Sequence, residues 1–189
     1  TEDSKRLVSH IVIEAVDSAA FALRAENHLH GPYEKNICDL QFALSIDPEM
    51  AQAHWLLADI YLATGQADLA EFSAAEAFKL DPSNEAYRLR WARALEQLAR
   101  YDDAVRETRA VLDSSNTPTI IQAQALQQMG RLASLGGLDI RSRAIPFQTK
   151  AIEMADSVAT SKHIADRRAA KQVLVDAHLA IGREIAGQE

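Results

Sequence analysis

The chain has 189 residues, of which 48% are hydrophobic and 25% are charged, with 7 Gly and 5 Pro. This composition is typical of a folded, mostly helical protein and excludes a disordered chain. The formal net charge is −7, and residues 1–84 carry 14 acidic side chains against 5 basic ones. Because phosphate binding needs clustered positive charge, this acidic half argues against a nucleic-acid partner.

The cysteine content and the length of the apolar runs exclude further classes of protein. Cys38 is the only cysteine, so we expect neither an internal disulfide nor a cysteine-based zinc site, and a lone thiol is compatible with a reducing compartment such as the cytoplasm. No apolar run approaches the ~20 residues that span a bilayer, so no membrane segment is expected here. The sequence begins with Thr, and we expect it to be part of a longer protein.

Apolar residues recur at helical spacing along the whole chain. Residues 3–30 contain no Pro or Gly and predict one long helix or two abutting ones, which Gly31 and Pro32 end. Pro146 falls within the first two turns of a later helical pattern, where a shifted start or a kink is expected. The helices predicted after Pro32 cover residues 34–46, 51–64, 68–80, 85–98, 104–112, 120–135, 140–155 and 162–186.

Two Asp-Pro dipeptides mark a repeat. The prolines of Asp47-Pro48 and Asp81-Pro82 lie 34 residues apart, and between them Gly65 joins two helical patterns. A fixed period near 34, with a helix–turn–helix in each period, is typical of a stacked helical solenoid. The apolar stripe of residues 162–186 predicts a terminal helix that covers the last exposed face.

The repeat residues are similar to those of a known family. Glycine or tyrosine stands at equivalent places in the turns, small residues stand where helices cross, and proline closes the first two periods: Gly31, Gly65, Tyr101, Ala43, Ala70, Ala77, Ala104, Pro48 and Pro82. In these residues the chain resembles the tetratricopeptide repeat family. The resemblance implies an all-α, right-handed solenoid of about four helix–turn–helix repeats with a long C-terminal helix.

The resemblance also implies a domain plan. It is close over residues 17–118 and looser over 119–156. We expect one domain over residues 1–189, with a helical extension at 3–16 and a C-terminal helix at 162–186. The repeats are expected at about 17–50, 51–84, 85–118 and 119–156.

In this family the first helix of each pair lines the concave side, which implies a groove for a protein or peptide partner. Gln127 and Gln128 are also expected on that side. For Trp55, two interpretations stay open: an anchor exposed in the groove, or a side chain buried against the neighbouring pair. The candidate groove residues are Trp55, Asp59, Leu89, Arg90, Arg93 and Arg131.

Arginines on one predicted helix bear on the partner. Arg90 and Arg93 share a face with each other, and guanidinium groups pair well with carboxylates, which predicts a site for an acidic or C-terminal segment. The other interpretation is a solvated face, on which these arginines and Arg88 pair with Glu85, Glu96 and Asp59 of the chain itself.

Catalytic chemistry is not indicated. The chain has no phosphate-binding loop, nucleophile elbow or HExxH motif, and His28 and His30 form its only close histidine pair without a third ligand nearby. We therefore expect no enzyme, cofactor or metal, but a protein–protein interaction module. The alternative is a structural spacer or assembly domain whose terminal helices dock on another domain or on a second copy. In that case the apolar face of residues 162–186 or of residues 7–23 would stay partly exposed in the monomer.

Overall fold

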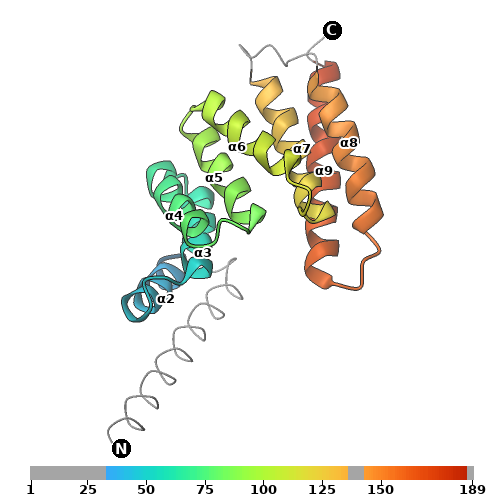
Figure 1. Ribbon diagram of the computed structural model, residues 1–189. Coiled ribbons are helices and arrows are strands. Elements are labelled where there is room, and N and C mark those ends of the chain that lie inside the picture. The colour runs from blue at the N-terminus through green and yellow to red at the C-terminus, as the bar shows by residue number, and fades with distance from the viewer. Residues whose placement is uncertain (1–32, 136–142, 187–189) are drawn as a thin grey trace, which may run out of the picture. The chain divides into compact units, whose positions relative to one another are not determined.

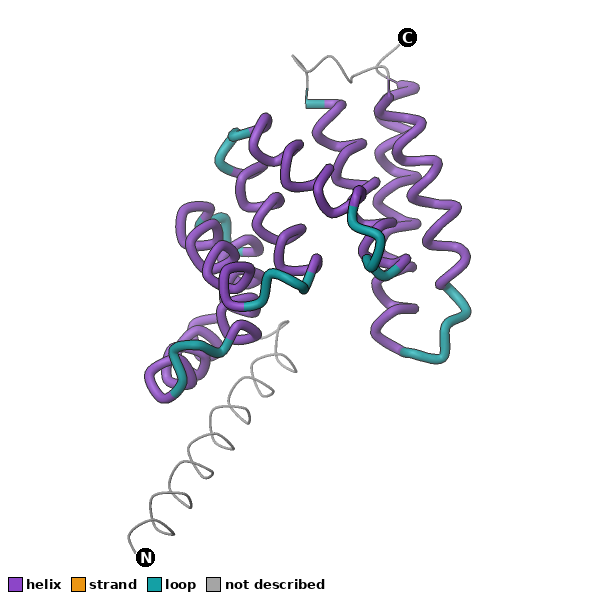
Figure 2. The backbone as a smooth tube through the Cα atoms, viewed as in Figure 1, coloured by secondary structure: helices purple, strands orange, loops and turns teal. Residues whose placement is uncertain are grey.

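The computed structural model describes residues 33–135 and 143–186, which contain eight α-helices and no strand (Figures 1 and 2). The expected all-α repeat fold is confirmed. The extension at 3–16, the start of the first repeat, Gly31 and the His28–His30 pair lie outside the described residues. The helices are α2 Tyr33–Ile46, α3 Ala51–Ala63, α4 Ala67–Leu80, α5 Glu85–Gln97, α6 Tyr101–Asp113, α7 Thr119–Ser134, α8 Ala144–Val158 and α9 Ile164–Ala186.

The chain divides into two compact units, of which the first ends at Leu98 and the second begins at Ala99. Helices α2 to α5 belong to the first unit, and α6 to α9 belong to the second. Whether all four expected repeats form one domain stays a prediction.

In the first unit each helix packs on the next one along the chain, and α3 also packs on α5. This is the packing order of a helical repeat, in which the first helices of successive pairs touch each other. Leu40, Leu56 and Ile60 are fully buried in the core of this unit. Repetition of one packing plan therefore positions α3 and α5 side by side.

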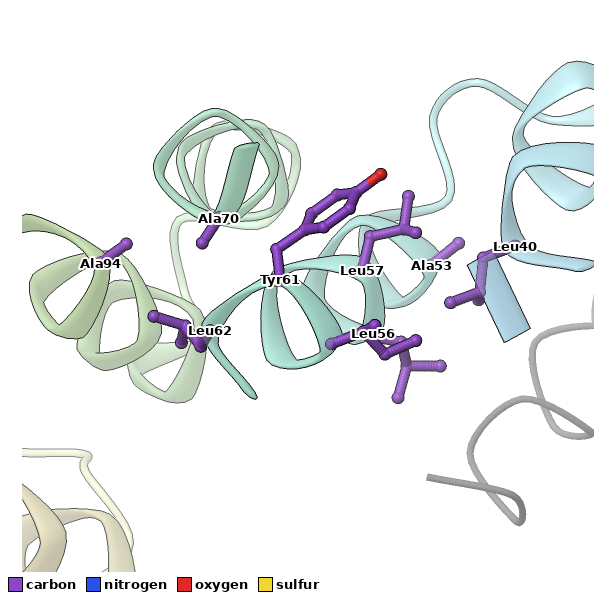
Figure 3. Packing of buried hydrophobic residues seen from close by; sticks show 9 residues of the cluster. Leu40, Ala53, Leu56, Leu57, Tyr61, Leu62, Ala70 and Ala94 are labelled. Carbon is purple, nitrogen blue, oxygen red and sulfur yellow. The ribbon is translucent and has the colours of Figure 1, made fainter. Parts of the chain in front are cut away.

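Small residues allow neighbouring helices to approach closely in both units. Ala70 is fully buried and points from α4 toward Leu62 and Ala94 (Figure 3). Ala104, at the equivalent place on α6, is fully buried as well. Because a close-packed interior has no space for added methyl groups, the size of these side chains sets how near the helices can lie.

The two Asp-Pro dipeptides form the same turn. The Asp47 carboxylate accepts a hydrogen bond from the Glu49 amide at 3.1 Å, and the Asp81 carboxylate accepts one from the Ser83 amide at 3.2 Å. Aspartate commonly stabilises turns by bonding the backbone two residues ahead. After the second turn, the Asn84 side chain accepts a hydrogen bond from the Ala86 amide at 3.2 Å and so caps the start of α5.

A left-handed backbone residue follows the first helix of each of two pairs. Gly65 has φ +74° after α3, and Ala99, which lies 34 residues later, has φ +56° after α5. Glycine suits this conformation because it has no Cβ. The repeat therefore fixes the backbone of this turn even where the residue is not glycine.

In the second unit α6 packs on α7, α7 on α8, and α8 on α9, while α7 also packs on α9 (Figure 1). Helix α9 contributes Ala170, Val173 and Ala177 to the core. Val173 and Ala177 belong to the apolar stripe predicted for the terminal helix, so this helix covers its neighbours as expected.

The second unit confirms one sequence-based detail and corrects another. Helix α8 begins at Ala144, which is the shifted start expected from Pro146. Pro146 lies in the first turn, where the missing N–H breaks no hydrogen bond. Gln127 and Gln128 are buried and do not line an open face, because α6, α8 and α9 all pack around α7. Among the described helices, none is long and apolar enough to cross a membrane.

Candidate functional site

Helices α3 and α5 bring an aromatic pair and a cation together. The Trp55 and Tyr87 rings have centroids 6.0 Å apart at an interplanar angle of 42°. The Arg90 guanidinium lies 5.9 Å from the Trp55 ring centroid, within the range of a cation–π contact. Trp55 and Arg90, predicted to face the same side, thus meet in the structure.

One turn along α3, Asp59 pairs with the same arginine. The distance from Arg90 Nε to Asp59 Oδ1 is 2.5 Å, and the two side chains are 28% and 19% exposed. Burial raises the pKa of the Asp59 carboxyl above its ordinary value, and attraction to Arg90 and then Arg93 offsets part of this rise. The carboxylate and both guanidinium groups therefore act on one another electrostatically.

A third contact joins the C-terminal ends of the two helices. There the side-chain amide of Gln97 donates a hydrogen bond to the Leu62 carbonyl oxygen at 3.1 Å. Trp55, Asp59 and Leu62 follow one another along α3, and their partners Tyr87, Arg90 and Gln97 follow in the same order along α5. The two helices therefore run in the same direction and present one continuous face, which we call the α3–α5 face.

The remaining predicted residues lie at different depths. Arg93 is exposed on α5, three residues after Arg90. Leu89 is 8% exposed and points into the interior, because it belongs to the apolar side of α5. Arg131 is half-buried in the last turn of α7, in the second unit. That Arg131 joins the other arginines stays a prediction.

Arg88 lies elsewhere, at the contact between α4 and α5. Its guanidinium lies 4.5 Å from the Phe78 ring centroid, and its Nε is 3.5 Å from the Glu85 carboxylate. Phe78 also stacks on Trp91 with centroids 6.1 Å apart, and the Trp91 indole donates a hydrogen bond to Glu71 at 3.0 Å. Arg88 and Arg90 each pair with a carboxylate of the chain, as the solvated-face interpretation expects.

Trp55 is partly buried and packs against the core cluster of the first unit. Its indole N–H is buried and has no hydrogen-bond acceptor among the described residues. A buried donor without an acceptor costs free energy, so this side chain has an unused polar group beside Arg90. The structure places Trp55 between the two interpretations that the sequence left open.

Tyr87 is the residue that sequence reasoning did not single out. Burial raises the pKa of the Tyr87 hydroxyl, Asp81 raises it further, and a hydrogen bond with Asn84 lowers it. The available signal was its spacing, since residues three apart share a helix face and Tyr87 precedes Arg90 by three.

The described residues offer no cluster of metal-binding side chains. No group of three or more His, Cys, Asp or Glu residues that could hold a metal ion occurs in residues 33–135 or 143–186. The Nε2 atom of His54 lies 3.1 Å from the Pro48 carbonyl oxygen. The α3–α5 face therefore offers ring surface and paired charges.

Comparison with known proteins identifies part of this region. Residues 51–84, which include α3, α4 and the turn after them, match the tetratricopeptide repeat family. No curated protein matches the chain. The resemblance is thus confirmed for the repeat that carries Trp55 and Asp59. Tetratricopeptide repeats are protein–protein interaction modules and typically serve as non-catalytic scaffolds, so this repeat supports a general role in protein–protein interaction.

Proposed function

We propose that the chain binds a peptide segment of a partner protein in a concave groove, and that the α3–α5 face contacts an acidic group of that segment. The observation that supports this most is the cluster of Trp55, Asp59 and Arg90 in and beside the matched repeat. All the candidate residues stand on the first helices of their pairs, namely Trp55, Asp59, Leu89, Arg90, Arg93 and Arg131.

Charge favours an acidic segment. Arg90 and Arg93 bring two guanidinium groups near the Asp59 carboxyl, whose pKa is raised by burial and lowered by both arginines. A guanidinium group has five N–H donors, which is more than one carboxylate can use. Arg90 can therefore donate hydrogen bonds to a second carboxylate while it stays paired with Asp59. Asp59 then serves to orient Arg90, and Arg93 adds a second cation at the exposed edge.

Aromatic surface supplies the second part of the proposal. Trp55 is partly exposed and is held by Tyr87 and by the core beneath it, so it offers a rigid apolar surface at little entropic cost. Tryptophan and arginine are the residue types most often found to dominate binding energy at protein interfaces. An apolar side chain of the partner would pack on Trp55, with an Asp, a Glu or a C-terminal carboxylate beside it.

The test is a screen of the full chain against a displayed library of acidic peptides, followed by measurement of Kd by fluorescence anisotropy. Trp55→Ala should weaken the selected peptides by ~2 kcal/mol or more, the cost typical of truncating a central aromatic residue. Arg93→Ala should weaken them as well. Arg109→Ala, at an exposed position on α6, is the matched control and should leave Kd unchanged.

The proposal fails if folded Trp55→Ala and Arg93→Ala variants bind the selected peptides as tightly as the wild type. It also fails if only basic peptides are selected. Circular dichroism of each variant separates loss of binding from loss of fold.

A further inference from the structure

Helix α9 has a second face, opposite the one that packs in the core of its unit. Ala170, Val173 and Ala177 are buried, whereas Val175 and Leu179 are 56% and 55% exposed. The exposed positions recur three or four residues apart along the whole helix and form what we call the outer α9 stripe: Ile164, Arg168, Lys171, Val175, Leu179, Gly182 and Ala186.

The spacing of the outer α9 stripe is that of a helix seam. Residues three and four apart lie in one line along a helix and can meet the side chains of a second helix. A Cβ built on Gly182 would have no atom within 4 Å, so a partner helix could approach closely there. Along the stripe, the basic residues Arg168 and Lys171 precede the apolar residues Val175 and Leu179, so its two ends differ in chemistry.

The most exposed charged side chains of α9 are positive. Arg167, Arg168, Lys171 and Arg183 are exposed, and none of the ion pairs between described residues involves these four cations. The acidic residues Asp166, Asp176 and Glu184 are all less exposed. The outer α9 stripe therefore combines apolar side chains with two exposed cations, Arg168 and Lys171.

These charges disfavour a second copy of the chain as the occupant. In a parallel pairing of two α9 helices, Arg168 would face Arg168 of the second copy, and Lys171 would face Lys171. In an antiparallel pairing centred on the apolar residues Val175 and Leu179, Lys171 would face Arg183. Either arrangement places like charges opposite each other, which is unfavourable.

A membrane surface fits less well. Helices that lie in a membrane interface commonly insert Trp, Phe or Leu from a broad apolar face. Helix α9 has no Trp, Phe or Tyr, and its outer α9 stripe is interrupted by Arg168 and Lys171. A narrow seam that combines apolar and charged side chains favours another helix instead.

We infer that the outer α9 stripe docks an amphipathic helix of a partner protein, whose apolar side packs on Val175 and Leu179 and whose Asp or Glu residues pair with Arg168 and Lys171. This surface lies in the second unit and does not depend on the α3–α5 face. Both contacts use side chains that are already exposed, so no rearrangement of the core is needed.

The test uses the full chain and two designed helical peptides with the same Leu/Ala seam, one flanked by Glu and the other by Lys. We expect the Glu peptide to bind at least about threefold more tightly, since each exposed ion pair contributes modestly. Val175→Ser/Leu179→Ser should weaken both peptides. Phe72→Ser, at a 61% exposed position on α4, is the matched control and should change nothing.

Charge reversal gives the sharpest outcome. In Arg168→Glu/Lys171→Glu the preference should transfer to the Lys peptide, while Trp55→Ala/Arg93→Ala should keep the wild-type preference. Equal binding of both peptides by the wild type would overturn the inference. So would self-association that Val175→Ser/Leu179→Ser abolishes, or binding to phosphatidylserine vesicles with no binding of either peptide. Failure of this test leaves the α3–α5 peptide screen unaffected.

Discussion

Ala99 adopts the left-handed conformation that Gly65 adopts 34 residues earlier. An L-residue with a Cβ pays roughly 1–2 kcal/mol for this region, whereas glycine pays little. We therefore predict that Ala99→Gly raises the free energy of unfolding by about 1 kcal/mol, and that Gly65→Ala lowers it by a similar amount. Urea denaturation of both variants checks this. Shifts of the same sign in both would contradict it.

Gly130 lies on α7 where it meets Gln148 of α8. A Cβ added at Gly130 would clash with Gln148 Nε2 and would lie 2.9 Å from Gln148 Cγ. Gln148 is held in place by a 3.1 Å hydrogen bond from its Nε2 to the Gln127 carbonyl oxygen. We predict that Gly130→Ala lowers the free energy of unfolding by about 1–3 kcal/mol through overpacking, despite the better helix propensity of alanine.

Two further variants isolate the cause at Gly130. In a Gln148→Ala background the clash is gone, so Gly130→Ala should become neutral or stabilising. Gly182→Ala, at a helical glycine with open space around it, should stabilise by up to about 1 kcal/mol. A Gly130→Ala penalty that is the same with and without Gln148 would rule out this contact as the source.

Asp59 gives a pH dependence with a defined sign. Because its folded-state pKa lies above the ordinary value of 3.8, the folded protein binds the proton more tightly than the unfolded chain. This group therefore contributes an increase in the free energy of unfolding as pH falls from above the folded-state pKa toward 3.8. The contribution should vanish in Asp59→Asn.

Removal of the arginine tests the electrostatic coupling directly. Arg90→Ala should raise the Asp59 pKa further, measured by NMR titration of the carboxyl carbon, because an attraction that lowers it is lost. Arg88→Ala is the control, since Arg88 pairs with Glu85. An Asp59 pKa that falls in Arg90→Ala would contradict the proposed coupling.

At the scale of helices, Ala70 sets the crossing of α4 with α3 and α5. Its side chain is fully buried and points toward Leu62 and Ala94 (Figure 3). We predict that Ala70→Leu lowers the free energy of unfolding by roughly 1–3 kcal/mol, because the added atoms have no space. Ala63→Leu, at an exposed position on α3, should stay within ~0.5 kcal/mol in the same urea experiment.

Helix positions could be predicted because their signals are local. The 34-residue spacing of the Asp-Pro dipeptides corresponds to two equivalent turns, and the described helices begin and end near the expected residues. The start of α8 at Ala144 was harder to predict, because spacing alone does not say whether Pro146 ends one helix or begins the next.

Side-chain contacts between helices were harder to predict than the helices themselves. Shared faces predicted that Trp55, Asp59 and Arg90 would lie together, and the structure brings them together. The sequence did not reveal Tyr87 as the ring beside Trp55. Contacts across α3 and α5 depend on small rotations and shifts of each helix, which periodicity does not determine.

At the scale of the molecule, the fold class followed from repetition, whereas burial did not follow in every repeat. Gln127 and Gln128 occupy positions that the repeat pattern expects to be open, but α7 is enclosed by three neighbours. The fourth repeat, residues 119–156, matches the repeat pattern less closely, so the pattern did not determine which side of α7 would be buried. The all-α architecture was therefore predictable from spacing, and the exposed surface of the second unit required coordinates.

The proposed acidic partner has a consequence for the whole chain, whose formal net charge is −7. Attraction to a local cationic site must act against general repulsion from the acidic chain. We therefore predict that added salt weakens selected acidic peptides less in Arg93→Ala than in the wild type, since the variant has lost a screened attraction. Titration of Kd against NaCl concentration checks this, and identical slopes would contradict it.

The most direct measurement of the central claim is paramagnetic broadening from a spin label on a selected acidic peptide. The Trp55 indole N–H and the Arg90 and Arg93 side chains should broaden, while Phe72 on α4 should not. Broadening at Phe72 or along α9, with Trp55 unaffected, would show that the peptide binds elsewhere and would contradict the account.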